Sequence, residues 1–316
     1  MEILLTDCTL SSLDAYDAEP GLLYQLLREI EKLPVHAIEL SPTVHEKLRP
    51  FRVLQGNRKR YILHKRQNKE ACPGFDGYLM MDYKPREPGA ATRYYGMDDN
   101  GNQIYQRLRG FDQYIGKEAS ERFQQMESVQ KQQIEIAPVD TYHCATAVGM
   151  AWIMQGGSRI AGSLAGIDGG LCMEELLLAV HTKGLANLSG QLAALPRAKS
   201  LLEQITGKHI SRKKPVLGQD IFAVEAGIHV DGLQKDSKLY EPYSPELVGL
   251  KRHIVIGKYS GRSAVMTKAR ELGIELLPDQ VPEVLACLQE YCAVTRHGLS
   301  DDKFRQLIMA EQRLVI

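Results

Sequence analysis

The beginning of the chain alternates between strand-like and helical spacing of its apolar residues. Residues 2–6 form a short apolar run that suits a buried strand, and residues 22–33 place leucine and isoleucine on one face at helical spacing. Pro20 suits the first turn of this helix, and Pro34 ends it. A second apolar run follows at residues 36–40. The order strand, helix, strand predicts a parallel sheet.

The stretch from residue 51 to residue 118 interrupts this pattern. It is polar, rich in arginine and tyrosine, and broken by glycine and proline, and it shows no helical periodicity. Residues 52–54, 61–64 and 78–82 have the composition of short strands. We expect residues 85–103 to form a loop.

Regular alternation of strands and helices returns after this stretch. Up to residue 207 we expect strands at 133–138 and 159–164 and helices at 117–132, 147–155, 172–181 and 192–205, the last interrupted at Pro196. Beyond it we expect a short strand at 253–257 and helices at 263–272, 281–293 and 300–310. The pattern predicts an α/β domain over residues 1–207, atypical at 51–132, and a linker with a small, mainly helical subdomain over residues 208–316.

The overall charge excludes some classes of partner. The 316 residues include 39 Lys and Arg and 39 Asp and Glu. This balance argues against a broad nucleic-acid or acidic-membrane surface. No apolar run reaches the roughly 20 residues of a membrane span, and the N-terminus lacks a signal-peptide pattern. We expect a cytoplasmic protein with no nucleic-acid or membrane partner.

The cysteines show no metal-binding or redox spacing, because no two of them form a C-x-x-C pair. We expect them to be reduced and structural. They are Cys8, Cys72, Cys144, Cys172, Cys287 and Cys292, of which Cys144 stands beside a histidine.

Four motifs in the C-terminal third occur in unbroken order. They are P-V-L-G at 215–218, F-A-V-E-A-G-I-H-V-D-G-L at 222–233, Y-E-P-Y-S-P-E-L-V-G at 240–249 and I-G-K-Y-S-G-R at 256–262. Together they resemble the linker and subdomain of the homocitrate synthase and isopropylmalate synthase family, most closely those of the nitrogenase-associated homocitrate synthases. Shorter similarities lie at residues 7–10, 36–42, 148–151 and 166.

The resemblance implies a TIM-type (β/α) barrel followed by the subdomain. Members of the family are metal-dependent acyl transferases that condense acetyl-CoA with a 2-oxo acid, for which 2-oxoglutarate is the first candidate here. A divalent metal (Mg, Mn or Zn) polarises the oxo acid, a base removes a methyl proton, and an arginine stabilises the oxyanion. Because a complete barrel takes about 250 residues, we expect a shortened or degenerate one with units missing or reduced.

The barrel motifs depart from the family pattern at charged positions. Where the family has D-T-T-L-R-D-G-E, this chain has Ser11 for the arginine and Ser12 for the metal-binding acid, and keeps an acid at Asp14. Where the family has H-x-H-N-D-x-G-M-A, the first ligand is retained as His143 and the second is replaced by Ala145. One imidazole does not make a divalent-metal site.

The subdomain, in contrast, retains the family positions that assist proton transfer. In the family a histidine and a tyrosine eleven residues later extend into the partner subunit's barrel, and these positions are His229 and Tyr240 here. The alternative is that both residues only pack a loop of the fold. Either way, the resemblance implies an oligomer: a homo-oligomer, or a hetero-oligomer with a complete homologue.

Three functions remain open. The first is an active condensing enzyme with a rebuilt site. The second is a catalytically reduced subunit that supplies His229 and Tyr240 to a complete homologue. The third is a non-catalytic protein that binds an acyl-CoA or a dicarboxylate through arginines of the atypical stretch, which otherwise are surface charges. The candidate residues for the rebuilt site are Asp7, Asp14, Glu39 (substrate), His143 (metal) and Asp168, and the arginines are Arg93, Arg107 and Arg109.

Overall fold

A computed structural model describes residues 2–314 of the chain. The gaps in this description are residues 56–58, 66–73, 83–90, 99, 113–120, 122, 186–191, 226–231, 233–235, 237, 239 and 296–297. The chain divides into two compact units, Met1–Gly218 and Gln219–Ile316. No described helix is long and apolar enough to cross a membrane.

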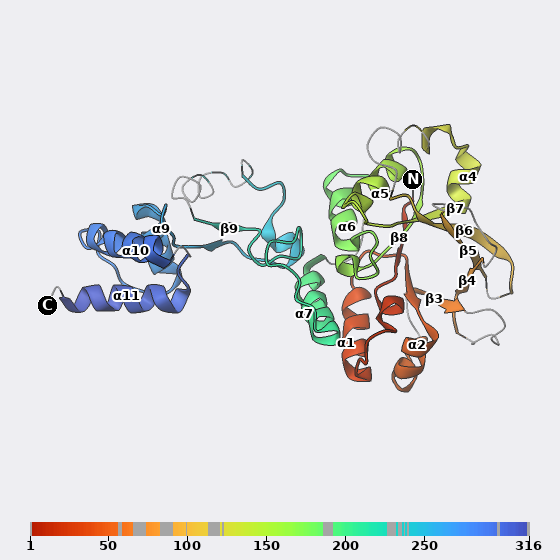
Figure 1. The fold of residues 1–316 in the computed structure, drawn as a ribbon, viewed down its shortest axis with the longest axis horizontal. Helices are drawn as coiled ribbons and strands as arrows, with labels where there is room; N and C mark the ends of the chain where they lie inside the picture. The colour runs from red at the N-terminus through yellow and green to blue at the C-terminus, as the bar shows by residue number, and fades with distance from the viewer. Residues whose placement is uncertain are drawn as a thin grey trace. The chain divides into compact units, whose positions relative to one another are not determined.

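The first unit is a closed barrel of eight strands, which Figure 1 shows in red to green. Its strands are β1 (Leu4–Asp7), β2 (Ala37–Leu40), β3 (Arg60–Lys65), β4 (Gly77–Met81), β5 (Thr92–Met97), β6 (Gln103–Gly110), β7 (Ile134–Pro138) and β8 (Arg159–Gly162). β5 pairs antiparallel with both neighbours, and every other pairing is parallel. The expected class, a degenerate TIM-type barrel in an α/β protein, is confirmed.

The helices of this unit cover the barrel unevenly. They are α1 (Pro20–Ile30), α2 (Pro42–Leu48), α4 (Ser128–Gln133), α5 (Ala145–Met154), α6 (Met173–Thr182) and α7 (Leu195–Thr206). In Figure 1, α1, α5, α6 and α7 lie on the side of the barrel opposite β4, β5 and β6. The described residues between β3 and β6 contain no helix, so the reduction affects helices and leaves the strand count at eight.

Several local predictions were wrong, among them the continuous helix at 117–132, since residues 126 and 127 are not helical. Residues 52–54 form a turn instead of a strand, because Arg52 has a left-handed φ of 51°. The expected loop at 85–103 contains β5, half of an antiparallel hairpin with β6. Pro196 does not interrupt a helix; it lies in the first turn of α7, where no intrahelical N–H is needed.

One glycine allows close packing against the hairpin of β5 and β6, which forms part of the barrel wall. Leu79, Tyr94 and Tyr105 pack together in the barrel interior. A Cβ on Gly96 would overlap the ring of Tyr105, so only glycine gives the ring this space. Gly96 therefore allows β5 to pack closely against the Tyr105 ring of β6.

The second unit is mainly helical. It contains a two-stranded parallel sheet of β9 (Ala223–Val224) and β10 (His253–Ile254), followed by α9 (Arg262–Glu271), α10 (Val281–Thr295) and α11 (Asp301–Leu314). Its apolar core includes Val265, Leu288 and Phe304, one from each helix. The helices expected at 263–272, 281–293 and 300–310 are confirmed.

Candidate functional site at the barrel mouth

The carboxyl ends of seven parallel strands and the beginning of β5 meet at one end of the barrel. A pocket of about 180 Å³ opens there. Its floor is the small apolar cluster Cys8, Ala137 and Ala161. The remaining lining residues are polar or aromatic: Ser11, Ser12, Glu39, His64, Tyr94, Arg107, Arg109 and Asp168. This end of a TIM-type barrel is where functional side chains are expected.

Arg107 of β6 lies inside the barrel between two carboxylates. Its Nη1 donates to Glu39 Oε2 and its Nε donates to Glu135 Oε2, each at 2.5 Å. Burial alone would lower the pKa of Arg107, but Glu135 and Glu39 raise it well above its ordinary value. Arg107 is 4% exposed, so its interpretation as a surface charge was wrong. The guanidinium is a permanent cation at the centre of this network.

Glu39 also contacts an imidazole and a thiol. His64 Nδ1 lies 3.3 Å from Glu39 Oε1, and the Cys8 thiol donates to Oε2 at 3.4 Å. Burial would raise the pKa of Glu39, but Arg107 and His64 hold it well below its ordinary value. Burial and the charge of Glu39 raise the pKa of Cys8, so Cys8 stays a thiol. Glu39 is therefore ionised, and its carboxylate joins the side chains of Arg107, His64 and Cys8.

A second arginine clamps the loop after β8. Arg109 Nη1 donates to Asp168 Oδ2 at 2.6 Å, and its Nη2 donates to the Asp168 carbonyl at 2.7 Å. The hydroxyl of Ser163 and the N–H of Gly170 donate to Asp168 Oδ1. All three polar oxygens of Asp168 thus hold the loop closed.

The acids of the first motif have structural partners. Asp7 is completely buried and accepts the Thr9 N–H at 3.0 Å, and burial raises its pKa to about 7. The Asp14 carboxylate accepts the hydroxyl of Ser41, the N-cap of α2. Ser12 of the same motif donates to the Cys8 carbonyl at 2.7 Å.

His143 is not among the residues that line this pocket. Its side chain is 93% exposed, its φ is 57°, and its Nδ1 lies 3.4 Å from Asp140 Oδ2. It comes just before α5, which begins at Ala145. The structure therefore does not bring this metal candidate together with Glu39, Asp7 or Asp14.

The two subdomain candidates belong to the second unit. His229 lies outside the described residues. Tyr240 is 46% exposed, and its ring occupies the position that a Cβ on Gly232 would need. Sequence reasoning missed His64, and the signal that could have identified it is its place near the end of a strand, one position in from Lys65.

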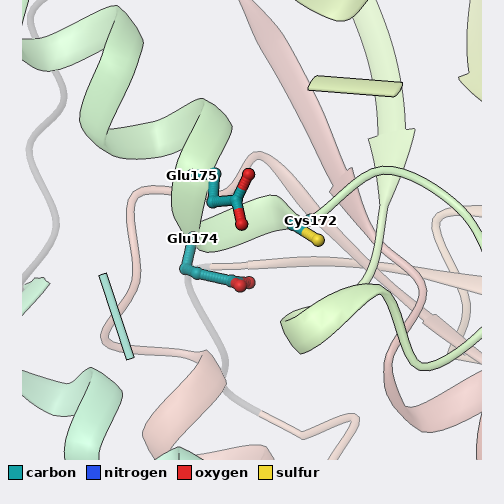
Figure 2. Close-up of side chains that lie close together, drawn as sticks. All are labelled: Cys172, Glu174 and Glu175. Carbon is teal, nitrogen blue, oxygen red and sulfur yellow. The ribbon is translucent and has the colours of Figure 1, made fainter. Parts of the chain in front are cut away.

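One cluster has the spacing of metal ligands but already contains a cation. Figure 2 shows Cys172, Glu174 and Glu175 at the beginning of α6, and their ligand atoms lie within 4.8 Å of one another. The Lys214 ammonium lies 3.3 Å from the thiol, 3.4 Å from Glu174 and 2.8 Å from Glu175. At the barrel mouth, Arg107 and Arg109 already form ion pairs with the neighbouring carboxylates. The described residues therefore do not fit a divalent ion in either place.

The comparisons with known proteins agree with the motifs. Residues 216–296 match the family described as homocitrate synthase post-HMGL domain-like. The chain is 34% identical to the homocitrate synthase omega subunit of Clostridium pasteurianum over 141 residues, which cover 45% of this chain and 40% of that protein. The resemblance to the homocitrate synthase and isopropylmalate synthase family is confirmed.

Two further relatives show the same partial coverage. Homocitrate synthase AksA of Methanocaldococcus jannaschii is 30% identical over 52% of this chain and 43% of its own length. A 2-isopropylmalate synthase of Geobacillus sp. is 33% identical over 55% of this chain and 35% of its own length. The chain thus spans less than half the length of these relatives.

Proposed function

We propose that this chain is a catalytically reduced subunit of an enzyme that condenses acetyl-CoA with a 2-oxo acid. In this proposal the barrel carries out no metal-dependent chemistry of its own. The second unit supplies His229 and Tyr240 to the barrel of a complete homologue, where they assist proton transfer. The name of one relative, an omega subunit, supports assembly with another chain.

The observation that carries the proposal is the position of Arg107 between Glu39 and Glu135. A divalent ion at the mouth needs charged oxygen or imidazole ligands, and a guanidinium that is bound to both carboxylates competes with it directly. Arg109 holds Asp168 in the same way. The mouth is stabilised by its own ion pairs and has no need of a metal.

The residues that replace charged positions of the first motif also argue against catalysis in this barrel. Ser11 and Ser12 both donate to the Cys8 carbonyl, so their hydroxyls support a turn and bring no charge to the pocket. Loss of a single group that stabilises a developing oxyanion costs about 10²–10³ in rate. Ser11 replaces such an arginine, and further charged positions are lost with it.

The test compares the chain alone with a mixed complex. The chain is purified and assayed for release of CoA thiol from acetyl-CoA with 2-oxoglutarate, in the presence of Mg²⁺, Mn²⁺ or Zn²⁺, and we expect no turnover. A complete homocitrate synthase homologue from the same genome is then inactivated in its subdomain and mixed with this chain. We expect turnover to return.

Variants of this chain locate the source of that turnover. His229→Ala and Tyr240→Phe should lower the rate of the mixed complex by about 10²-fold each, because proton-transfer groups contribute about 10²–10⁴. Turnover by the chain alone would overturn the proposal in favour of a rebuilt active site. Binding of 2-oxoglutarate or acetyl-CoA without any mixed-complex activity would instead support a non-catalytic binding protein.

A further inference from the structure

Lys214 connects the last segment of the first unit to the beginning of α6. Its ammonium contacts Glu174 and Glu175 and lies beside the thiol of Cys172, the three side chains drawn in Figure 2. Burial alone would lower the pKa of Lys214, but Glu174 and Glu175 raise it well above its ordinary value. Lys214 therefore carries its charge at any physiological pH.

Glu174 also holds the loop at the barrel mouth. Its side chain is fully buried, and its Oε2 accepts the N–H of Ala165 at 2.8 Å. Ala165 has a φ of 57°, a left-handed conformation that is unfavourable for a residue with a Cβ. Ala165 is close in the chain to Asp168, which Arg109 clamps. One carboxylate thus ties Lys214 to this loop.

The segment that follows Lys214 contains a second strained residue. Val216 has a φ of 67° and is 5% exposed, and a β-branched residue in this region is a true outlier. Such a conformation is strained and persists only where the surroundings enforce it. The Gly218 N–H donates to the Lys214 carbonyl at 2.8 Å, and a Cβ on Gly218 would overlap the Arg212 carbonyl. The turn is therefore closed and tightly packed.

The position of this turn in the chain gives it a role. The first unit ends at Gly218 and the second begins at Gln219, so the strained turn is the last structure of the first unit along the chain. Burial of Val216 and Leu217 favours the turn, and the Lys214 ion pairs hold it against α6. Without these contacts, the strain at Val216 would be released by opening the turn.

We propose that Lys214 is a positioning residue for the condensation reaction. Its ammonium anchors the turn of residues 214–218 on Glu174 and Glu175, and so holds closed the last turn of the first unit, directly before the chain continues into the second unit. This inference rests on the proposed function, because the unit that follows the turn in the chain carries Tyr240 and His229. Through Glu174, the same anchor is linked to the mouth loop.

The first test measures the anchor without any partner. Hydrogen exchange of the full chain is compared for wild type, Lys214→Met, Lys214→Arg and the matched control Lys213→Met, whose lysine is exposed. In Lys214→Met we expect exchange at the amides of Leu217 and Gly218 to be about 10-fold faster, because local opening governs exchange. Lys214→Arg and Lys213→Met should resemble wild type. Unchanged exchange in Lys214→Met would show that the Lys214 ion pairs do not hold the turn closed.

The second test uses the mixed complex and separates positioning from local stability. In Lys214→Met we expect kcat to fall about 10-fold or more while the KM for 2-oxoglutarate in the homologue's barrel is unchanged, because misplacement of a reacting group by about 1 Å can cost 10²-fold. Lys214→Arg should restore kcat. Faster exchange with an unchanged kcat would overturn the positioning role. If the wild-type mixture is itself inactive, the proposed function fails, and the exchange experiment alone decides the anchor.

Discussion

Arg107 Nη1 donates a hydrogen bond to Glu39 Oε2 at 2.5 Å inside the barrel, and both side chains are buried. The pair joins β6, from the atypical part of the chain, to β2, from the regular part. Glu135 of β7 takes the other side of the guanidinium and accepts the Thr6 hydroxyl at 2.7 Å. The ion network therefore crosses the barrel interior.

Removal of the central cation should destabilise the barrel. Arg107→Met keeps most of the aliphatic stem but leaves Glu39 and Glu135 buried without their partner. We expect the free energy of unfolding to fall by about 3–5 kcal/mol, measured by urea denaturation at pH 7. The exposed Arg93→Met is the control and should change it by less than about 0.5 kcal/mol. A loss below about 1 kcal/mol in Arg107→Met would contradict the role of the guanidinium as the cation that holds both carboxylates.

The buried carboxyl of Asp7 should make stability depend on pH. Its pKa is about 7 in the folded chain, compared with 3.8 for the ordinary group. Between these values the folded state binds more protons than the unfolded state, so the free energy of unfolding decreases as pH rises. Asp7→Asn removes this effect. The variant should gain about 4 kcal/mol over wild type between pH 4 and pH 8.

Thermal unfolding at pH 4 and pH 8 measures this difference. Asp17→Asn is the matched control, since that carboxylate is fully exposed and its substitution should give no such gain. An Asp7→Asn variant that is less stable than wild type at pH 8 would mean that the Asp7 charge is itself favourable, against the direction of its pKa.

Gly96 should tolerate no side chain. Gly96→Ala places a methyl group where the Tyr105 ring lies, and we expect a loss of about 1–3 kcal/mol in the free energy of unfolding. A Cβ on Gly21 of α1 would meet no atom within 4 Å, so Gly21→Ala should be neutral or stabilising. Chemical denaturation of both variants provides the comparison. Equal stability of Gly96→Ala and wild type would contradict the packing of the hairpin.

Divalent ions should not bind stoichiometrically at the barrel mouth. Isothermal titration of the chain with Mn²⁺, Mg²⁺ and Zn²⁺, with and without 2-oxoglutarate, should give no saturable heat, because Arg107 and Arg109 hold the carboxylates. His143→Ala should behave like wild type, since this imidazole is exposed to solvent. Metal binding that strengthens with the oxo acid would instead require a rearranged mouth.

The periodicity of apolar residues identified most regular elements, because these elements bury one face and expose the other. The spacing of leucines in α1 predicts a face that is buried, and Leu23, Leu26, Leu27 and Ile30 are indeed buried. The hairpin of β5 and β6 was harder to predict, since its inward positions alternate tyrosine, glycine and arginine. Such residues look like loop composition until the barrel around them accounts for their burial.

Local chemistry along the chain was sufficient to identify the family resemblance and the absence of charged residues at Ser11, Ser12 and Ala145. The partners of the remaining charges were decided only by folding. Glu39, Arg107 and Glu135 are separated by 68 and 28 residues, and no pattern along the chain relates them. Closure of the barrel brings them together, because adjacent strands point alternate side chains into one small interior. There a buried charge needs an opposite one, and Arg107 fills that need.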